Sequence, residues 1–565
     1  MLWVCTPPGG SHASCHGPHS KSTVPKFLIS PSKPPRRLLA FFIGWLVLTS
    51  LAVGASRDRF PGESAKWRRY QSPNFELFSA NRDSESRELL HDLELLRALF
   101  YQTFKLKERQ PQEVTIYFFS EDKAFKAYCQ PQQRQSLAGY YLYRPDRAVI
   151  AISPAWSDES QRYVIFHEYI HHLNRALASD PPLWYNEGVA ELFSTIEVEK
   201  NHAMLGKPLP WHISSLRRET LLPLEKLFAV DWTSPIYNNG KHSGQFYAES
   251  WALLHFWHFG NTKLDRRKFE LFTLYLMNEP DGAVPSQRRQ VFKDLLGFDF
   301  PEMEKLLADY VSGGSFSFYE APLPKIFDSK SYEWRAVDHD EIRDRLAELS
   351  LRVNRSSDAR LVMLQATEKS PVTPRVWEVL GTDAGADGDY DVAEERWQKA
   401  LDAGSHNPAI FHEIGQIEAR RWFARFDYYF RLPPPRAEQL RTLLKRSIEC
   451  APDQFAAYET LAWVEASVAK PNLANVNLVQ EHFKSLRDKS RTLVALALVR
   501  VHLDDQTGAT TLLDQLALLK SDNWVENAAE IVRAQLEGRA PRKINRPETP
   551  EPSQTIRMTM PELPK

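Results

Sequence analysis

Residues 164–172 carry side chains that can hold a metal ion. This stretch reads Val-Ile-Phe-His-Glu-Tyr-Ile-His-His, with His167 and His171 four residues apart and Glu168 next to the first histidine. On a helix, residues four apart project from the same face about one turn from each other. Two imidazoles in that arrangement can ligate one zinc ion, and the neighbouring glutamate can act as a general base. His172 would point about 100° away, so we expect it to be a packing or surface histidine.

A second polar segment follows downstream, where residues 186–191 read Asn-Glu-Gly-Val-Ala-Glu. A His-Glu-x-x-His helix followed after a short gap by an Asn-Glu-Gly-x-Ala-Glu helix resembles the gluzincin zinc peptidases. The short gap is most similar to that of the bacterial secreted peptidase-MA-like proteins. The resemblance covers about residues 70–310 and implies that Glu187 is the third zinc ligand.

The chemistry of such a ligand set agrees with hydrolysis. Two neutral imidazoles and one carboxylate leave a fourth position for water, and zinc can lower the pKa of that water to about 7. Glu168 would accept the proton of the water and pass it to the leaving amine. Glu191 lies four residues after Glu187, on the same helical face, where it can accept the distal N–H of a ligand histidine. A solvated helix face is the alternative for both glutamates.

A tyrosine farther along the chain is a candidate for stabilising the oxyanion of the transition state. Tyr247 follows Glu187 at a distance similar to that of the gluzincin tyrosine with this role, although a buried core tyrosine is the alternative. We expect His255 to be a core histidine, because its helix is rich in Trp and Phe, and nothing fixes the position of His242. The Gly-x-Met-Glu-Asn motif of the aminopeptidase branch is missing, which favours an endopeptidase.

The segments before the motif predict a mixed sheet beside the metal-binding helix. Alternating or β-branched apolar runs predict strands, at 75–79, 114–119, 139–143 and 148–152. Apolar residues at helical spacing predict a helix over 84–104, and a short helix is expected around 122–128. The motif helix should begin near Ser157, a good N-cap, and end before Pro181. Further helices, the last including 300–310, should close this part.

Residues 340–537 predict a stack of helix pairs of the tetratricopeptide type. Small and large residues recur with a period of 34, first at Leu346, Ala347, Ala359, Met363, Ala366 and Pro371, then at Trp377, Leu380, Gly381, Ala393, Trp397 and Ala400. An insertion around 426–435 delays the second helix of the third unit, and residues 489–537 are expected to form one more helix pair. Such arrays present a concave surface for partners, or they only stabilise a neighbouring domain.

The two ends of the chain are interpreted as targeting and tail segments. A basic leader precedes the apolar run 38–53 and small residues up to Ser56, which fits a secretory signal peptide cleaved after Ala55 or, alternatively, an uncleaved anchor. The proline-rich tail begins after residue 537. Cys129 and Cys450 read as isolated thiols, with one interdomain disulfide as the alternative. The net charge of −1 gives no indication of nucleic-acid binding.

The sequence therefore predicts an α+β zincin-like catalytic domain, with a mixed sheet and active-site helices, followed by an all-α tetratricopeptide solenoid. The expected segments are a leader at 1–55, a metallopeptidase domain at 56–320, a linker at 321–339, the repeats at 340–537 and the tail at 538–565. The expected function is that of an exported, periplasmic or secreted zinc endopeptidase acting on peptides or proteins. The alternatives are a non-catalytic envelope adaptor with a structural zinc site, and a zinc hydrolase acting on a non-peptide amide.

Overall fold

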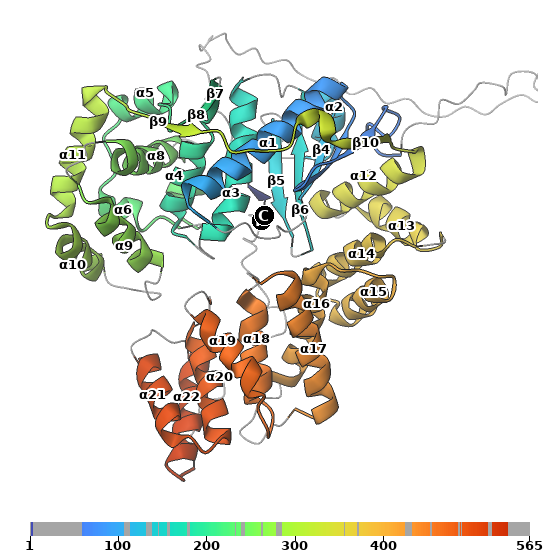
Figure 1. The fold of residues 1–565 in the computed structure, drawn as a ribbon, viewed down its shortest axis with the longest axis vertical. Coiled ribbons are helices and arrows are strands. Elements are labelled where there is room, and N and C mark those ends of the chain that lie inside the picture. The colour runs from blue at the N-terminus through green and yellow to red at the C-terminus, as the bar shows by residue number, and fades with distance from the viewer. Residues whose placement is uncertain are drawn as a thin grey trace, which may run out of the picture.

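The computed structural model of the 565-residue chain combines a mixed sheet, two groups of helices beside it and a long helical array (Figure 1). The structure describes residues 2–3, 59–106, 114–130, 138–144, 146–154, 159–177, 181–199, 201–231, 233–238, 243–260, 264–277, 285–354, 356–369, 372–423, 432–452, 455–483, 486, 489–517 and 523–540. The apolar run 38–53, Ser157, His242 and the tail from 541 lie outside them. Among the described residues, no helix is both long and apolar enough to span a membrane.

The main sheet is built from the strands that the apolar patterns predicted and from three further strands at or next to its edges. The predicted strands form β3 (Phe75–Ser79), β4 (Val114–Phe118), β5 (Gly139–Tyr143) and β6 (Ala148–Ile152). The strands found only in the structure are β1 (Leu2–Trp3), β2 (Arg68–Gln71) and β10 (Glu333–Ala336). Within the described residues the order is β1-β5-β6-β4-β3-β2-β10. Strands β3, β4 and β6 are parallel to one another, and the outer strands pair antiparallel, so the sheet is mixed as expected.

One face of this sheet is covered by the two long helices α1 (Asp83–Thr103) and α3 (Glu159–Leu177). Successive strand side chains point to opposite faces, so Phe75 and Leu77 of β3, and Val114 and Ile116 of β4, share a core with these helices. Aromatic contacts reinforce the packing, since the ring of Tyr169 on α3 lies 5.1 Å from that of Phe75. This face fixes the orientation of the helix that carries the His-Glu-x-x-His motif.

A group of helices continues from α3 and is packed with it in the same core. It contains α4 (Leu183–Phe193), α5 (Pro210–Arg218), α6 (Leu224–Leu227), α7 (Pro235–Asn238), α8 (Ser243–Phe259), α9 (Arg266–Met277), α10 (Pro285–Leu296) and α11 (Phe300–Gly313). A small antiparallel sheet, β7 (Glu197–Glu199), β8 (His202–Leu205) and β9 (Tyr319–Pro322), lies against it. Helix α11 contains the helix expected over 300–310.

The opposite face of the main sheet is covered by α2 (Asp122–Ala127) and by the first helices of the array. Phe78 on β3 and Tyr117 on β4 share a core with α12 (His339–Asn354), α13 (Ser357–Ala366) and α14 (Pro374–Ala386). Residues 321–339, expected to be a linker, contain the end of β9 and all of β10, so this segment belongs to both sheets. The array is therefore part of the covering of the main sheet.

The array continues as antiparallel helices and arcs away from the sheet (Figure 1). Its later members are α15 (Tyr390–Asp402), α16 (Pro408–Phe423), α17 (Pro434–Cys450), α18 (Phe455–Ala466) and α19 (Leu473–His482). Residues 489–537 form three helices, α20 (Lys489–His502), α21 (Gln506–Ala517) and α22 (Asn523–Leu536), so the expected single pair was wrong. A left-handed turn at Asp504, with φ of 58°, separates the first two. Cys129 and Cys450 are not joined by a disulfide, and the thiol of Cys129 lies 3.6 Å from the carbonyl oxygen of Phe125.

Candidate metal centre

Helices α3 and α4 bring the candidate ligands together. On α3, the apolar residues Ile165, Phe166 and Ile170 are buried in the core, and His167 and His171 project from another part of its surface. Pro181 and Pro182 separate the two helices and start α4, which packs directly on α3. Because α4 turns back against α3, a residue in its second turn faces the two histidines.

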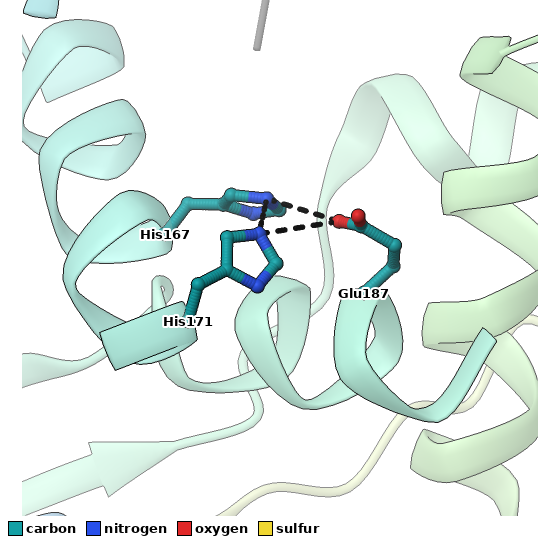
Figure 2. Close-up of side chains that lie close together, drawn as sticks. All are labelled: His167, His171 and Glu187. Carbon is teal, nitrogen blue, oxygen red and sulfur yellow. Dashed lines mark hydrogen bonds and ion pairs between the residues drawn. The ribbon is translucent and has the colours of Figure 1, made fainter. Parts of the chain in front are cut away.

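The three side chains predicted to be ligands converge on one point (Figure 2). The Nε2 atoms of His167 and His171 are 3.0 Å apart, and Oε2 of Glu187 lies 3.3 Å from the first and 3.4 Å from the second. A tetrahedral ion bonded at 2.0–2.1 Å separates its ligand atoms by about 3.3 Å. All three residues are buried. The triangle therefore has the size that a four-coordinate metal ion requires, and the group can hold one.

Each imidazole has a side-chain oxygen near its far nitrogen. Nδ1 of His167 lies 3.5 Å from Oε1 of Glu191, and Nδ1 of His171 is 3.3 Å from Oδ1 of Asn186. Asn174 donates to that same amide oxygen at 2.7 Å. With a metal ion bound, these acceptors would favour the tautomer that carries the hydrogen on Nδ1, which leaves the lone pair of each Nε2 atom for the ion. Three electron-pair donors then face one another, and a cation between them satisfies all three.

The surroundings of the site keep His167 neutral and Glu187 ionised, which are the states in which each can bind a metal ion. Burial lowers the pKa of His167 to about 4, so this imidazole is neutral at neutral pH. Burial alone would raise the pKa of Glu187, but His171 and the hydrogen bonds from both histidines lower it to about 2. Burial alone would lower the pKa of His171, but its interactions with the Glu187 carboxylate outweigh burial and raise that pKa. A bound cation would replace that proton as the partner of the carboxylate.

Glu191 connects the site to a second histidine that the sequence did not point to. Its Oε2 lies 2.8 Å from Nε2 of His212 on α5, while its other oxygen faces His167. The His212 ring packs against Trp251 of α8, with ring centroids 6.0 Å apart. His212 thus holds the carboxylate that orients a ligand. It lies 21 residues beyond Glu191, so no local spacing reveals it.

Tyrosines lie beside the candidate ligands, and of these only Tyr247 was a sequence candidate. The ring centroid of Tyr247 on α8 lies 6.1 Å from that of His167, so the expected oxyanion residue is beside the site. Tyr237 on α7 donates its hydroxyl to Oε1 of Glu187 at 3.1 Å. Nothing in the sequence singled Tyr237 out. The two rings are themselves neighbours, 6.1 Å apart.

The other residues considered in the sequence, Glu168, His172 and His255, are all buried but have different surroundings. Glu168 is buried on α3 beside the ligands, and its charge contributes to the raised pKa of His171. His172 points away from the ligands, with its Nδ1 2.9 Å from the hydroxyl of Tyr141 on β5. His255 is a core residue whose nitrogens meet Gly206 O at 2.7 Å and the Tyr310 hydroxyl at 2.6 Å. The structure therefore separates the two candidate ligand histidines from the two histidines that pack elsewhere in the core.

No protein-family model matches the chain, and no curated protein matches its sequence. The side chains of this site are therefore the basis for assigning a function to the chain.

Proposed function

We propose that the chain is a zinc-dependent peptidase of gluzincin type, in which His167, His171 and Glu187 hold the metal ion. The observation that carries the proposal is the convergence of two imidazole nitrogens and one carboxylate oxygen at 3.0 to 3.4 Å, with a glutamate directly after the first histidine. A purely structural zinc site has no use for that extra glutamate, since its ligands fill all four positions.

In the proposed reaction, zinc supplies Lewis acidity, which lowers the pKa of a water molecule and polarises the carbonyl of the bond to be cleaved. Glu168 takes the proton of the attacking water and delivers it to the leaving amine, so one carboxylate serves as base and then as acid. The Tyr247 hydroxyl donates a hydrogen bond to the oxygen that becomes negative. Glu191 and Asn186 hold the imidazoles in the tautomer that this requires.

Peptides or proteins are the proposed substrates, with an endopeptidase favoured. The helical array is proposed to be a tetratricopeptide solenoid that binds a protein partner or substrate, and the chain is proposed to work outside the cytoplasm. The close approach of α14 and α15 supports the solenoid, because a Cβ on Gly381 would lie 2.4 Å from the Trp397 ring. Small residues at such positions let paired helices nest.

The test uses the full chain, its bound metal and two variants. We expect the purified wild type to contain about one zinc per chain and to cleave members of a peptide library. Glu168→Gln should keep the zinc and lose at least about 100-fold in kcat/KM, because the general base is gone. His171→Ala should lose the zinc as well. Metal analysis and peptide cleavage measured on the same preparations separate these effects.

Glu270→Gln is the matched control, since it makes the same change at an exposed position on α9. Its zinc content and kcat/KM should equal those of the wild type. Wild-type protein that binds no zinc even when supplied with it would contradict the proposal. Retention of full biological function by Glu168→Gln would instead indicate a scaffold with a structural metal site.

A further inference from the structure

We infer that Tyr237 is a positioning residue for the carboxylate ligand, holding Glu187 so that a single oxygen faces the metal. The inference rests on the proposed function, because it concerns how the same three ligands are arranged. It assigns a role to a residue that belongs to neither motif and lies 50 residues beyond Glu187.

The two carboxylate oxygens of Glu187 have different partners. Oε2 faces Nε2 of His167 and of His171, at 3.3 and 3.4 Å. Oε1 accepts the hydroxyl hydrogen of Tyr237 at 3.1 Å. A hydrogen bond to one carboxylate oxygen makes that oxygen a poorer ligand than the other, so the hydroxyl favours binding of an ion through Oε2 alone.

Each ligand has a separate support from a different side chain of the fold. Glu191 lies beside His167, Asn186 beside His171, and Tyr237 beside Glu187. Among these contacts, the Tyr237 hydroxyl is the one that orients the Glu187 carboxylate, through its Oε1 atom. Two-oxygen binding would add a ligand atom to the metal and fill part of the position that water needs.

The Tyr237 ring is held in place independently of its hydroxyl. Its centroid lies 6.0 Å from that of Phe246 and 6.1 Å from that of Tyr247, both on α8. The side chain therefore approaches Glu187 from a helix different from those that carry the ligands. Removing only the hydroxyl leaves these ring contacts in place, so Tyr237→Phe is expected to fold.

The experiment measures metal affinity and coordination, not only activity. Zinc affinity is determined by competition with a chromophoric chelator for the full-length wild type and for Tyr237→Phe, and visible absorption spectra are recorded after replacement by Co²⁺. We expect about tenfold weaker zinc binding in Tyr237→Phe, the usual effect of losing an outer-shell partner. Its Co²⁺ bands should also weaken, because binding through both oxygens raises the coordination number.

Tyr310→Phe is the matched control, since it also removes a single tyrosine hydroxyl, in this case from the contact with His255. It should leave zinc affinity and the Co²⁺ spectrum unchanged. A Tyr237→Phe protein that cleaves peptides and matches the wild type in both measurements would overturn this inference and leave the peptidase proposal intact. A wild type that binds neither ion would overturn both. Melting temperatures of the metal-free proteins report whether each variant is folded.

Discussion

The residues of the site divide into those joined by local spacing and those joined by packing. His167 and His171 share one helical face, so their spacing was enough to propose them as a pair. Glu187 was proposed from the resemblance to the gluzincins, and Glu191 from its spacing of four residues after Glu187. His212 and Tyr237 reach the same site from α5 and α7. No periodicity connects them to the motif, which is why sequence reasoning missed them. Contacts between side chains on different helices, such as these, can be identified only from the structure.

Gly188 shows why the motif has a glycine immediately after the ligand. A Cβ at this position would lie 2.6 Å from the backbone oxygen of Ser250 and 2.8 Å from Cδ1 of Leu254, both on α8. Real side chains do not tolerate such a contact with backbone, so α4 would have to move away from α8. That movement would carry Glu187 with it.

We therefore predict that Gly188→Ala destabilises the protein by about 1–3 kcal/mol, the usual cost of overpacking, and weakens zinc binding. The free energy of unfolding in urea, with and without zinc, measures both effects. Gly244→Ala is the control, because a Cβ at Gly244 has no neighbour within 4 Å. Equal stabilities for the two variants would show that α4 and α8 can separate at no cost.

At the scale of the elements, the strands with strong apolar patterns were predictable and the edge strands were not. The bounds of β3, β5 and β6 match the predicted ranges, because these strands are almost entirely buried and rich in apolar and aromatic residues. All four residues of β10 are exposed, and this strand was missed. An edge strand that faces water carries no apolar alternation. Only its hydrogen bonds to β2 define it.

The helix pair α14–α15 offers a test of how closely the helices of the array must pack. A Cβ on Gly381 would lie 2.4 Å from the Trp397 ring, whose Nε1 also donates to Glu378 O at 3.2 Å. We predict that Gly381→Ala destabilises the protein despite the higher helix propensity of alanine. Thermal unfolding of the full chain measures this effect.

Gly385 provides the comparison, because it lies one turn later on the same helix. A Cβ on Gly385 would have Cη2 of Trp397 as its nearest neighbour, at 3.3 Å. A small shift of the ring relieves that contact, so Gly385→Ala should be neutral or should raise the melting temperature through the propensity gain of up to about 1 kcal/mol. The reverse order of the two variants would contradict the packing argument.

At the scale of the whole molecule, the docking of the array on the main sheet was not predicted, although the strands contained a signal for it. Phe75 and Leu77 point to one face of β3 and Phe78 to the other, and all three are buried. A strand with apolar residues on both faces must be covered on both. Because the repeats were predicted to form a separate domain, no helices were expected on the second face of the sheet.

Buried ion pairs hold the array to the sheet. Glu76 on β3 and Glu348 on α12 share Arg375 of α14, with N–O distances of 2.8 Å to each. Asp146, which precedes β6, accepts from Arg352 of α12 at 3.0 Å. Removing one member of such a network leaves a buried charge without its partner, which is strongly destabilising. The array and the sheet should therefore unfold together.

These pairs make stability depend on pH in a defined window. Burial alone would raise the pKa of Glu76, but the guanidinium groups of Arg375, Arg345 and Arg69 lower it from 4.5 to about 2. A carboxyl whose pKa is lower in the folded state stabilises the protein above its unfolded value and loses that contribution on acidification. For Glu76 the contribution is on the order of 3 kcal/mol at neutral pH, lost as the pH falls from 4.5 toward 2.

We predict that the free energy of unfolding in urea falls steeply across that window in the wild type and less steeply in Glu76→Gln, which has no proton to gain at this position. Glu187 also has a pKa lowered to about 2 and contributes to the wild-type slope. The comparison of the two proteins removes that common contribution, because both retain Glu187. Parallel pH profiles would show that the contact between Glu76 and Arg375 does not hold the array against the sheet.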